Sequence, residues 1–238
     1  MGAGRRAGGA QYIPRPAVWS LVDTALPVTH PLAVTVDDIA AALADAPVGQ
    51  PVAPAFAEAR QSAVLIAVAD GPGGAEVVLT RRAEHLSSHR GEMSFPGGRL
   101  DAGETPVEAA LREANEEVGL DAASVEVLGE LTHLNTVVSR SYIVPIVARL
   151  PERLMVAATS PEVERVLWLP LAELVRVDTY RSERWGRDPT DRVLHFFELD
   201  DETVWGATAT MLIDLLARLA PARSTGQRSQ QRPRRFDV

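Results

Sequence analysis

The chain contains no cysteine among its 238 residues. Disulfide bonds, a thiolate nucleophile and zinc sites built from cysteine are therefore excluded. Long apolar runs are missing too, since none approaches the roughly 18 residues of a membrane-spanning helix. The N-terminal residues include arginines but lack the apolar core of a secretory signal. We therefore expect a cytoplasmic protein that does not associate with membranes.

An excess of basic residues is absent as well. The chain has 24 Lys and Arg against 32 Asp and Glu, which gives a formal net charge of −8. This balance argues against nucleic acid as a partner, because such binding normally requires a basic surface. A chain of this length can bury a sizeable core, and we expect one domain with additions rather than two full domains.

One stretch near the middle of the chain carries the strongest local signals. Thr105 and Glu108 have the spacing of a capping box, in which each side chain binds the backbone N–H of the other residue. Pro106 suits the first position of a helix. Gly119 suits the left-handed position that commonly ends one. The pattern therefore predicts a helix over residues 106–118, with a loop before it.

Three glutamates lie on one side of this predicted helix. Glu113, Glu116 and Glu117 stand at i, i+3 and i+4, so they share an arc beside the apolar face. Like charges at this spacing repel each other. The helix alone leaves two interpretations open. One is a solvated acidic face, and the other is a site where carboxylate oxygens bind a hard divalent cation such as Mg2+ or Mn2+.

The loop and the helix together resemble the Nudix box, G-x5-E-x7-R-E-U-x-E-E-x-G-U, in which U is an aliphatic residue. Its fixed positions are occupied by Gly98, Glu104, Arg112, Glu113, Glu116, Glu117, Gly119 and Leu120, with Ala114 at the first U. By this resemblance the chain is identified as a member of the Nudix hydrolase family. The family implies an α/β fold, an α/β/α sandwich around a mixed sheet. We expect this domain over residues 30–220, after a partly disordered extension (1–29) and before a disordered tail (221–238).

The resemblance also implies a chemistry for the acidic helix. Nudix enzymes hydrolyse the pyrophosphate of a nucleoside diphosphate linked to another moiety. Bound Mg2+ or Mn2+ ions would offset the charge of such a substrate and lower the pKa of a bound water. Glu113, Glu116 and Glu117 match the metal-binding glutamates of the family. The backbone at Gly98 matches the place where a carbonyl group often binds the metal.

Other residues match supporting and catalytic roles of the family. Glu104 and Arg112 match the pair that supports the loop and orients the helix. The catalytic base varies among Nudix enzymes and often lies outside the box. Two candidates stay open here: Glu113, and Glu162 in a distal loop, which could equally be an exposed loop acid.

The segment before the box, residues 78–98, resembles the signature of the coenzyme A pyrophosphatase branch, L-L-T-x-R-[SA]-x3-R-x3-G-x3-F-P-G-G. The agreeing residues are Leu79, Thr80, Arg82, Ala83, Gly91, Phe95, Pro96, Gly97 and Gly98. Ser87 stands where the signature has arginine, and it cannot make the bidentate phosphate contact of that residue. Arg90, three residues later, could substitute for it. The resemblance thus implies that Arg82, Arg90 and Gly97 bind substrate.

The expected reaction is metal-dependent hydrolysis of coenzyme A or an acyl-coenzyme A. Its products would be adenosine 3′,5′-bisphosphate and 4′-phosphopantetheine or the acyl form. Because Ser87 departs from the signature, ADP-ribose, a dinucleotide or a nucleoside triphosphate stays open as the substrate. A non-catalytic nucleotide sensor is a further alternative, against which the intact set of glutamates argues. Family members are often dimers, which leaves a homodimer open.

Four aromatic side chains have two interpretations each. His85 and His89 could bind a metal ion, but Mg2+ prefers oxygen ligands, which favours solvated loop histidines. Trp168 and Trp205 could stack on an adenine. Their positions in a predicted strand and at a helix start favour packing in the core.

Apolar patterns predict the other elements of the fold. Residues 63–69 and 76–82 are expected to form a hairpin around a Gly- and Pro-rich turn. Thr35 is expected to cap a helix whose first turn is acidic. Further strands are expected at residues 125–132, 142–149, 165–169 and 193–199, and further helices at residues 36–46, 170–175 and 207–219.

Overall fold

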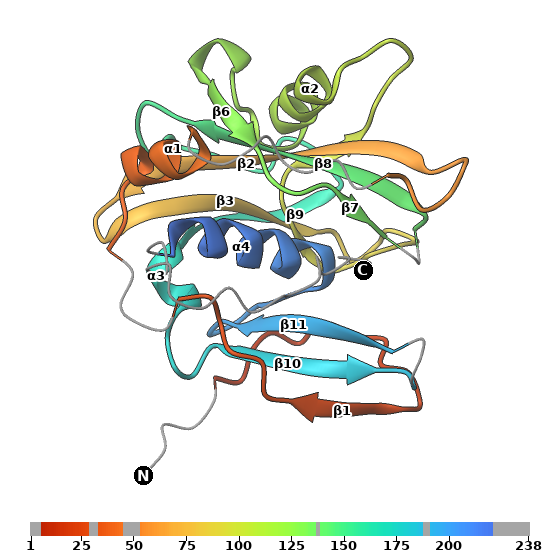
Figure 1. Ribbon diagram of the computed structural model, residues 1–238. Helices are drawn as coiled ribbons and strands as arrows, with labels where there is room; N and C mark the ends of the chain where they lie inside the picture. The colour runs from red at the N-terminus through yellow and green to blue at the C-terminus, as the bar shows by residue number, and fades with distance from the viewer. Residues whose placement is uncertain (1–5, 29–32, 45–52, 137–138, 188–190, 221–238) are drawn as a thin grey trace.

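The computed structural model describes residues 6–28, 33–44, 53–136, 139–187 and 191–220 (Figure 1). Two β-sheets and four α-helices form the fold within these ranges. The helices are α1 (Val36–Ala44), α2 (Pro106–Val118), α3 (Leu171–Leu174) and α4 (Gly206–Leu219), and a 3-10 turn covers Ala122–Ser124. Among the described residues, no helix is long and apolar enough to cross a membrane.

The larger sheet has eight strands and is mixed. Near its centre, β2 (Arg60–Gly71) pairs in parallel with β8 (Ser141–Arg149) and forms an antiparallel hairpin with β3 (Gly74–Arg82). This hairpin confirms the one predicted from the sequence. The other strands of the sheet are β4 (Met93–Ser94), β5 (Gly97–Arg99), β6 (Glu126–Glu130), β7 (Leu134–Asn135) and β9 (Val163–Pro170).

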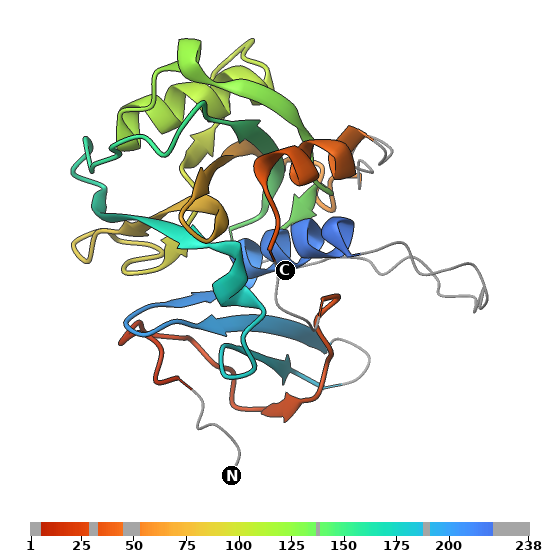
Figure 2. The ribbon, with the colours of Figure 1, turned by 90° about the vertical axis from the view of Figure 1, so that its left-hand side faces the viewer.

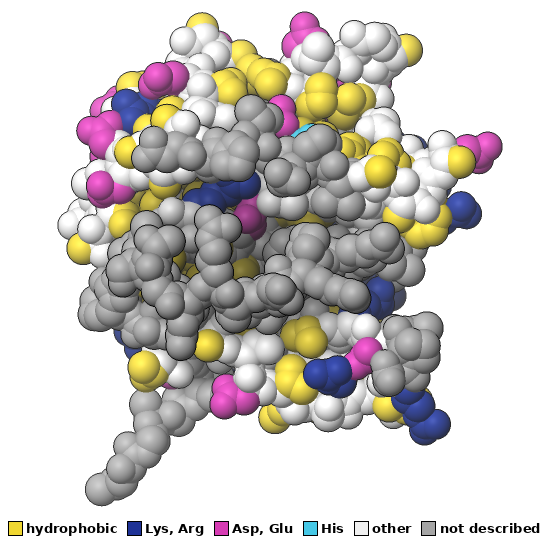
Figure 3. All heavy atoms as spheres, viewed as in Figure 1, with side chains coloured by type: hydrophobic (Ala, Val, Ile, Leu, Met, Phe, Trp, Pro, Cys, Tyr) yellow, Lys and Arg dark blue, Asp and Glu magenta, His cyan; other side chains and the backbone are white. Residues whose placement is uncertain are grey.

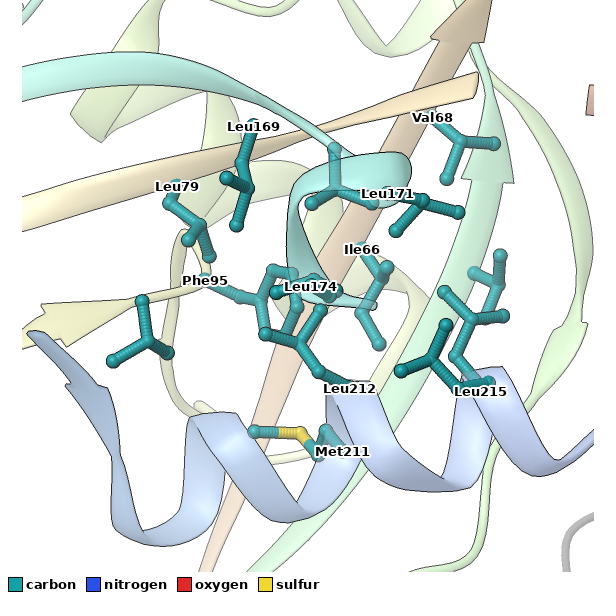
Figure 4. Packing of buried hydrophobic residues seen from close by; sticks show 14 of the residues in the cluster. Ile66, Val68, Leu79, Phe95, Leu169, Leu171, Leu174, Met211, Leu212 and Leu215 are labelled. Atoms are coloured by element: carbon teal, nitrogen blue, oxygen red, sulfur yellow. The ribbon is translucent and has the colours of Figure 1, made fainter. Parts of the chain in front are cut away.

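Helices cover both faces of the larger sheet (Figures 1 and 2). Alternate side chains of β2 enter two different clusters, because successive residues of a strand point to opposite faces. Leu65 packs toward α2, whereas Ile66 and Val68 pack toward α4, where Leu212 and Leu215 meet them (Figure 4). Each fully buried side chain of this kind contributes roughly 1.5–3 kcal/mol. The arrangement is the predicted α/β/α sandwich around a mixed sheet.

A second, four-stranded antiparallel sheet lies on the far side of α4 (Figure 1). Its edge strand β1 belongs to the N-terminal segment and pairs with β10 from Trp19 opposite Trp185 to Val22 opposite Ser182. The sequence did not predict this sheet as a unit. Its strands are β1 (Trp19–Val22), β10 (Tyr180–Trp185), β11 (Arg192–Glu198) and β12 (Thr203–Trp205).

The predicted helices and longer strands are confirmed, with ends that shift by a few residues. The strands that were not predicted, β1, β4, β5, β7, β10 and β12, are short or lack apolar alternation. Residues 1–5 and the tail 221–238 lie outside the described residues. On the face shown in Figure 3, acidic side chains gather on the side of α1, and arginines lie at the lower edge of the four-stranded sheet.

Candidate active site

Helix α2 begins and ends as the sequence predicts. Glu108 N donates to Thr105 Oγ1 at 3.3 Å, and Thr105 N donates to Glu108 Oε2 at 2.8 Å, which completes the capping box. Gly119 adopts φ 73°, and its N–H donates to Asn115 O at 3.0 Å. The local sequence therefore fixes both ends of the helix and, with them, the direction in which its glutamates point.

Arg112 joins the loop before α2 to the helix. Its Nε and Nη2 donate to the two oxygens of Glu104 at 2.9 and 3.1 Å, and Nη2 also donates to Arg99 O at 3.0 Å. Its Nη1 donates to Glu113 at 2.9 Å and to Glu116 at 3.4 Å. The hydrogen bonds from this guanidinium hold the pKa of Glu104 below its ordinary value. The two residues predicted to support the loop thus lie in contact.

Strand β5 brings two glycines against α2. The N–H of Gly97 donates to Glu117 Oε2 at 3.3 Å. A Cβ atom on Gly98 would lie 2.2 Å from Glu113 Oε1, and one on Gly97 would lie 2.4 Å from Ala63 O. Neither distance is accessible to non-bonded atoms. A side chain at Gly97 would collide with the backbone of β2, and one at Gly98 would displace the Glu113 carboxylate. The backbone of β5 consequently lies directly beside two of the predicted metal-binding carboxylates.

Burial disfavours the ionised form of two of these carboxylates. Burial raises the pKa of Glu117 to about 7, opposed by the N–H of Gly97 and reinforced by the charge of Glu113. Burial also raises the pKa of Glu113; the hydrogen bond from Arg112 opposes this, and the charge of Glu162 adds to it. Buried carboxylates that repel one another are stabilised by a nearby cation.

Glu116 differs from its two neighbours, because 57% of its side chain is exposed. Within the ranges that the structure describes, no three His, Cys, Asp or Glu side chains gather closely enough to hold a metal ion. The predicted three-glutamate site is therefore not assembled in this arrangement. The donor chemistry still fits a hard divalent cation, because the groups at the site are carboxylates and Gly98 gives them room.

Arg82 and Glu162 meet beside Glu113 and Glu117. We call the side of α2 that carries Glu113, Glu116 and Glu117 its acidic edge. Arg82 Nη2 donates to Glu162 Oε2 at 3.2 Å, and Ala83 N donates to Glu162 O at 2.8 Å. The positive charge of Arg82 helps to lower the pKa of Glu117 against the effect of burial. Two predicted site residues from distant parts of the chain thus come together beside the buried glutamates.

The rest of the predicted substrate loop is exposed. Ser87 and Arg90 are both exposed. His89 Nδ1 lies 2.9 Å from Glu92 Oε2, and the hydrogen bond between them raises the pKa of His89. His85 is also exposed.

Both tryptophans singled out from the sequence pack against apolar clusters. Trp168 borders the cluster beneath α2, and its Nε1 donates to Leu154 O at 3.2 Å. Trp205 stacks on Phe196 with ring centroids 6.1 Å apart and planes inclined by 6°. The predicted core packing is confirmed for both residues.

A hollow of about 730 Å³ lies along α2. Glu104 and Arg112 line it, whereas Glu113, Glu116 and Glu117 do not. The carboxylates of Glu113 and Glu117, which lie against the glycine backbone of β5, thus stand outside this hollow.

Sequence reasoning missed Thr159. Its Oγ1 donates to Glu116 O at 2.7 Å, and its N–H donates to Glu117 O at 3.0 Å. These contacts join a loop to the C-terminal turn of α2 across more than 40 positions of the chain. No local pattern marks such a residue, because its partners are backbone carbonyls of a distant helix.

Comparison with known proteins gives concordant results. The sequence pattern of the NUDIX domain matches residues 59–202. The chain is 38% identical over 179 residues to Nudix hydrolase 3 of Caenorhabditis elegans, covering 66% of this chain and 72% of that protein. It is 34% identical over 162 residues to the uncharacterised Nudix hydrolase NudL of Yersinia pestis, covering 68% and 80%.

Solved structures are also similar in part. A Nudix hydrolase from M. smegmatis, RenU, matches 48% of this chain and 73% of its own, with 27% identity and a TM-score of 0.40. The NUDIX domain of Shewanella oneidensis NrtR, solved with ADP ribose, matches 53% and 82%, with 21% identity and a TM-score of 0.41.

Proposed function

The chain belongs to the Nudix family, and from that premise we propose that it hydrolyses the pyrophosphate bond of coenzyme A or of its thioesters. Water would attack one phosphorus as the bridging P–O bond breaks. The products would be adenosine 3′,5′-bisphosphate and 4′-phosphopantetheine or its acyl form. The cytoplasm, where coenzyme A is used, is the proposed location.

The observation that carries this proposal concerns Arg82. It lies in the segment that resembles the coenzyme A branch, and its Nη2 reaches Glu162 at the acidic edge of α2. The Arg82 side chain is 25% exposed, so its guanidinium is open to a ligand. A phosphate oxygen is a suitable partner for a guanidinium. Arg82 is thus a fitting contact for the substrate, with the N–H-bearing backbone of Gly97 close to the same edge.

The glutamates of α2 serve the chemistry in this proposal. Glu113, Glu116, Glu117 and the carbonyl of Gly98 would hold Mg2+ or Mn2+. When bound, the cation would supply charge neutralisation for the pyrophosphate and lower the pKa of water. Arg82 orients a phosphate group.

One carboxylate near this site accepts the proton of the attacking water. Glu162 is the candidate that faces the glutamates from a separate loop, and Glu113 is the alternative on the helix itself. Glu104 and Arg112 keep the loop and the helix in register without touching the substrate.

Ser87 supports a second candidate function. It replaces the arginine of the branch signature, and the Arg90 side chain is exposed. Recognition of the 3′-phosphate of coenzyme A would then be weak. ADP-ribose, a dinucleotide or a nucleoside triphosphate would serve as the substrate of the same metal-dependent reaction, and a sensor that binds without cleavage is the non-enzymatic alternative.

Product analysis tests the proposal. The purified protein is incubated with Mg2+ or Mn2+ and, in parallel, coenzyme A, acetyl-coenzyme A, dephospho-coenzyme A, ADP-ribose and a nucleoside triphosphate. Release of adenosine 3′,5′-bisphosphate from coenzyme A is the expected result. Cleavage of ADP-ribose or the triphosphate alone would replace the substrate while leaving the reaction class intact, and no cleavage of any compound would favour a sensor.

A further inference from the structure

The segment between β8 and β9, residues 150–162, is attached to the fold near both of its ends. Near its start, Arg153 Nε donates to Glu76 Oε2 at 2.7 Å. Near its end, Thr159 contacts the last turn of α2. Between them Met155 is fully exposed. The segment is therefore held to the fold at several points, and Thr159 is the one that contacts α2 beside the proposed active site.

Thr159 donates hydrogen bonds to carbonyl groups at the C-terminal end of helix α2. The last four carbonyl groups of a helix have no partner within the helix. The left-handed cap provides one partner, because Gly119 N donates to Asn115 O. Thr159 provides the next two, with its hydroxyl on Glu116 O and its N–H on Glu117 O. One threonine thus caps the carbonyls of two predicted metal-binding residues.

A short rigid turn connects Thr159 to Glu162. Val163 N donates to Ser160 O at 3.1 Å, and Glu162 N donates to Ser160 Oγ at 3.2 Å. Pro161 further restricts the backbone of this turn. Because the turn is closed by hydrogen bonds, the place at which Thr159 is held helps to set where Glu162 stands.

The far side of the turn is held as well. Ala83 N donates to Glu162 O at 2.8 Å, and Arg82 Nη2 donates to the Glu162 carboxylate at 3.2 Å. Glu162 is thereby fixed between the end of β3 and the end of α2. Its carboxylate remains 54% exposed, so it is open to solvent at the edge of the site.

We propose that Thr159 is a positioning residue: by capping Glu116 O and Glu117 O, it docks the 160–163 turn on α2 and sets Glu162 beside the acidic edge. The inference rests on the proposed function, in which Glu162 acts on the attacking water. Thr159 itself touches neither substrate nor metal. It acts through the position of Glu162.

Three variants test this role. Thr159→Val removes the hydroxyl and keeps the shape and the backbone N–H. Thr159→Ser keeps the hydroxyl. Met155→Ala changes an exposed side chain of the same segment and serves as the control. Hydrogen exchange of the metal-free proteins, measured over residues 157–164, reports docking without any reference to activity. Exchange should be about two- to tenfold faster in Thr159→Val, as expected for one lost hydrogen bond, and unchanged in the other two.

Kinetics test the link to Glu162, with the substrate that product analysis identifies. Thr159→Val should lower kcat about five- to tenfold and change KM less than twofold, since misplacement of a catalytic group affects the chemical step. Thr159→Ser should restore at least half of kcat. In a Glu162→Gln background, Thr159→Val should lower kcat less than twofold, because the residue through which Thr159 acts has already lost its function.

The outcomes separate this inference from the proposed function. Unchanged exchange in Thr159→Val would overturn the docking role, whatever the activity. Equal losses of kcat with and without Glu162 would overturn the route through Glu162. If the wild type cleaves nothing, the proposed function fails, and the exchange comparison alone decides whether Thr159 docks the turn.

Discussion

The carboxylate of Glu113 occupies the space that a side chain on Gly98 would need. A Cβ built on Gly98 would lie 2.2 Å from Oε1 and 2.3 Å from Cδ of Glu113. The neighbouring glycine has a different constraint, because a Cβ on Gly97 would meet backbone atoms, Ala63 O at 2.4 Å and Val64 Cα at 2.6 Å. One collision involves a movable side chain, and the other involves the fixed centre of the sheet.

We therefore expect Gly98→Ala to lose mainly activity and Gly97→Ala to lose mainly stability. Glu113 can turn away from a methyl group, so Gly98→Ala should keep most of its stability and lose at least about tenfold in kcat as the carboxylate moves. Gly97→Ala should be destabilised by about 1–3 kcal/mol, as overpacked sites are. Thermal unfolding and steady-state kinetics of both variants distinguish the two effects. Equal behaviour of the variants would contradict the assignment.

Removal of a buried glutamate tests the metal assignment. Glu117→Gln keeps the shape of the side chain and removes its charge, so kcat should fall by about 100-fold or more, as expected when charge neutralisation in the transition state is lost. Mn2+ binding, followed by titration, should weaken in parallel. Glu126→Gln, at an exposed site on β6, is the matched control. A Glu117→Gln enzyme with wild-type turnover would exclude this residue from the metal site.

Arg112 should not tolerate lysine. Its guanidinium donates hydrogen bonds to Glu104, Glu113 and the carbonyl of Arg99 at the same time, and a single ammonium group cannot reproduce that geometry. Arg112→Lys should therefore lower kcat about tenfold with a small change in melting temperature. Arg149→Lys, which alters an ion pair to the exposed Asp37, should leave kcat unchanged. Full activity of Arg112→Lys would show that charge alone suffices.

Helix α2 was predictable because the residues that define it are close together in the sequence. The capping box, the glycine cap and the spacing of Glu113, Glu116 and Glu117 all act within one or two turns. Arg112 and Glu104 are eight positions apart and were found through the family pattern. Their roles in catalysis remain predictions.

Two other features were not predictable for a common reason. Strand β10 has charged residues, Arg181 and Glu183, where a buried strand normally shows apolar alternation. Partners from other elements, Glu198 and Arg15, neutralise them. Thr159 binds backbone carbonyls whose neighbourhood exists only after folding. In both cases the stabilising partner is distant in sequence, so no local pattern reveals it.

Glu183 makes the four-stranded sheet sensitive to pH. Burial alone would raise the pKa of Glu183, but hydrogen bonds from Arg15 and Trp185 outweigh it, and the pKa lies below the ordinary 4.5. A carboxyl group with a lowered folded-state pKa stabilises the fold above pH 4.5 and loses that contribution as the pH falls through its folded-state pKa.

Glu183→Gln should accordingly be less stable than the wild type by about 1.5–3 kcal/mol at pH 7, since the charge-assisted hydrogen bonds from Arg15 and Arg181 are lost. The difference should shrink as the pH falls from 4.5 through the lower folded-state pKa, below which the wild-type carboxyl group is also neutral. Denaturant unfolding at several pH values measures both quantities. A constant difference across the pH range would contradict the ionised state assigned to Glu183.

The central claim is that the acidic edge of α2 supports metal-dependent cleavage of coenzyme A. The most direct measurement is kcat/KM of the wild-type protein for coenzyme A and for ADP-ribose, with Mg2+ or Mn2+ and with the metal removed by a chelator. We predict that coenzyme A is preferred by at least about tenfold, a difference of about 1.4 kcal/mol, and that the chelator abolishes cleavage. Preference for ADP-ribose, or cleavage that persists without metal, would contradict the account.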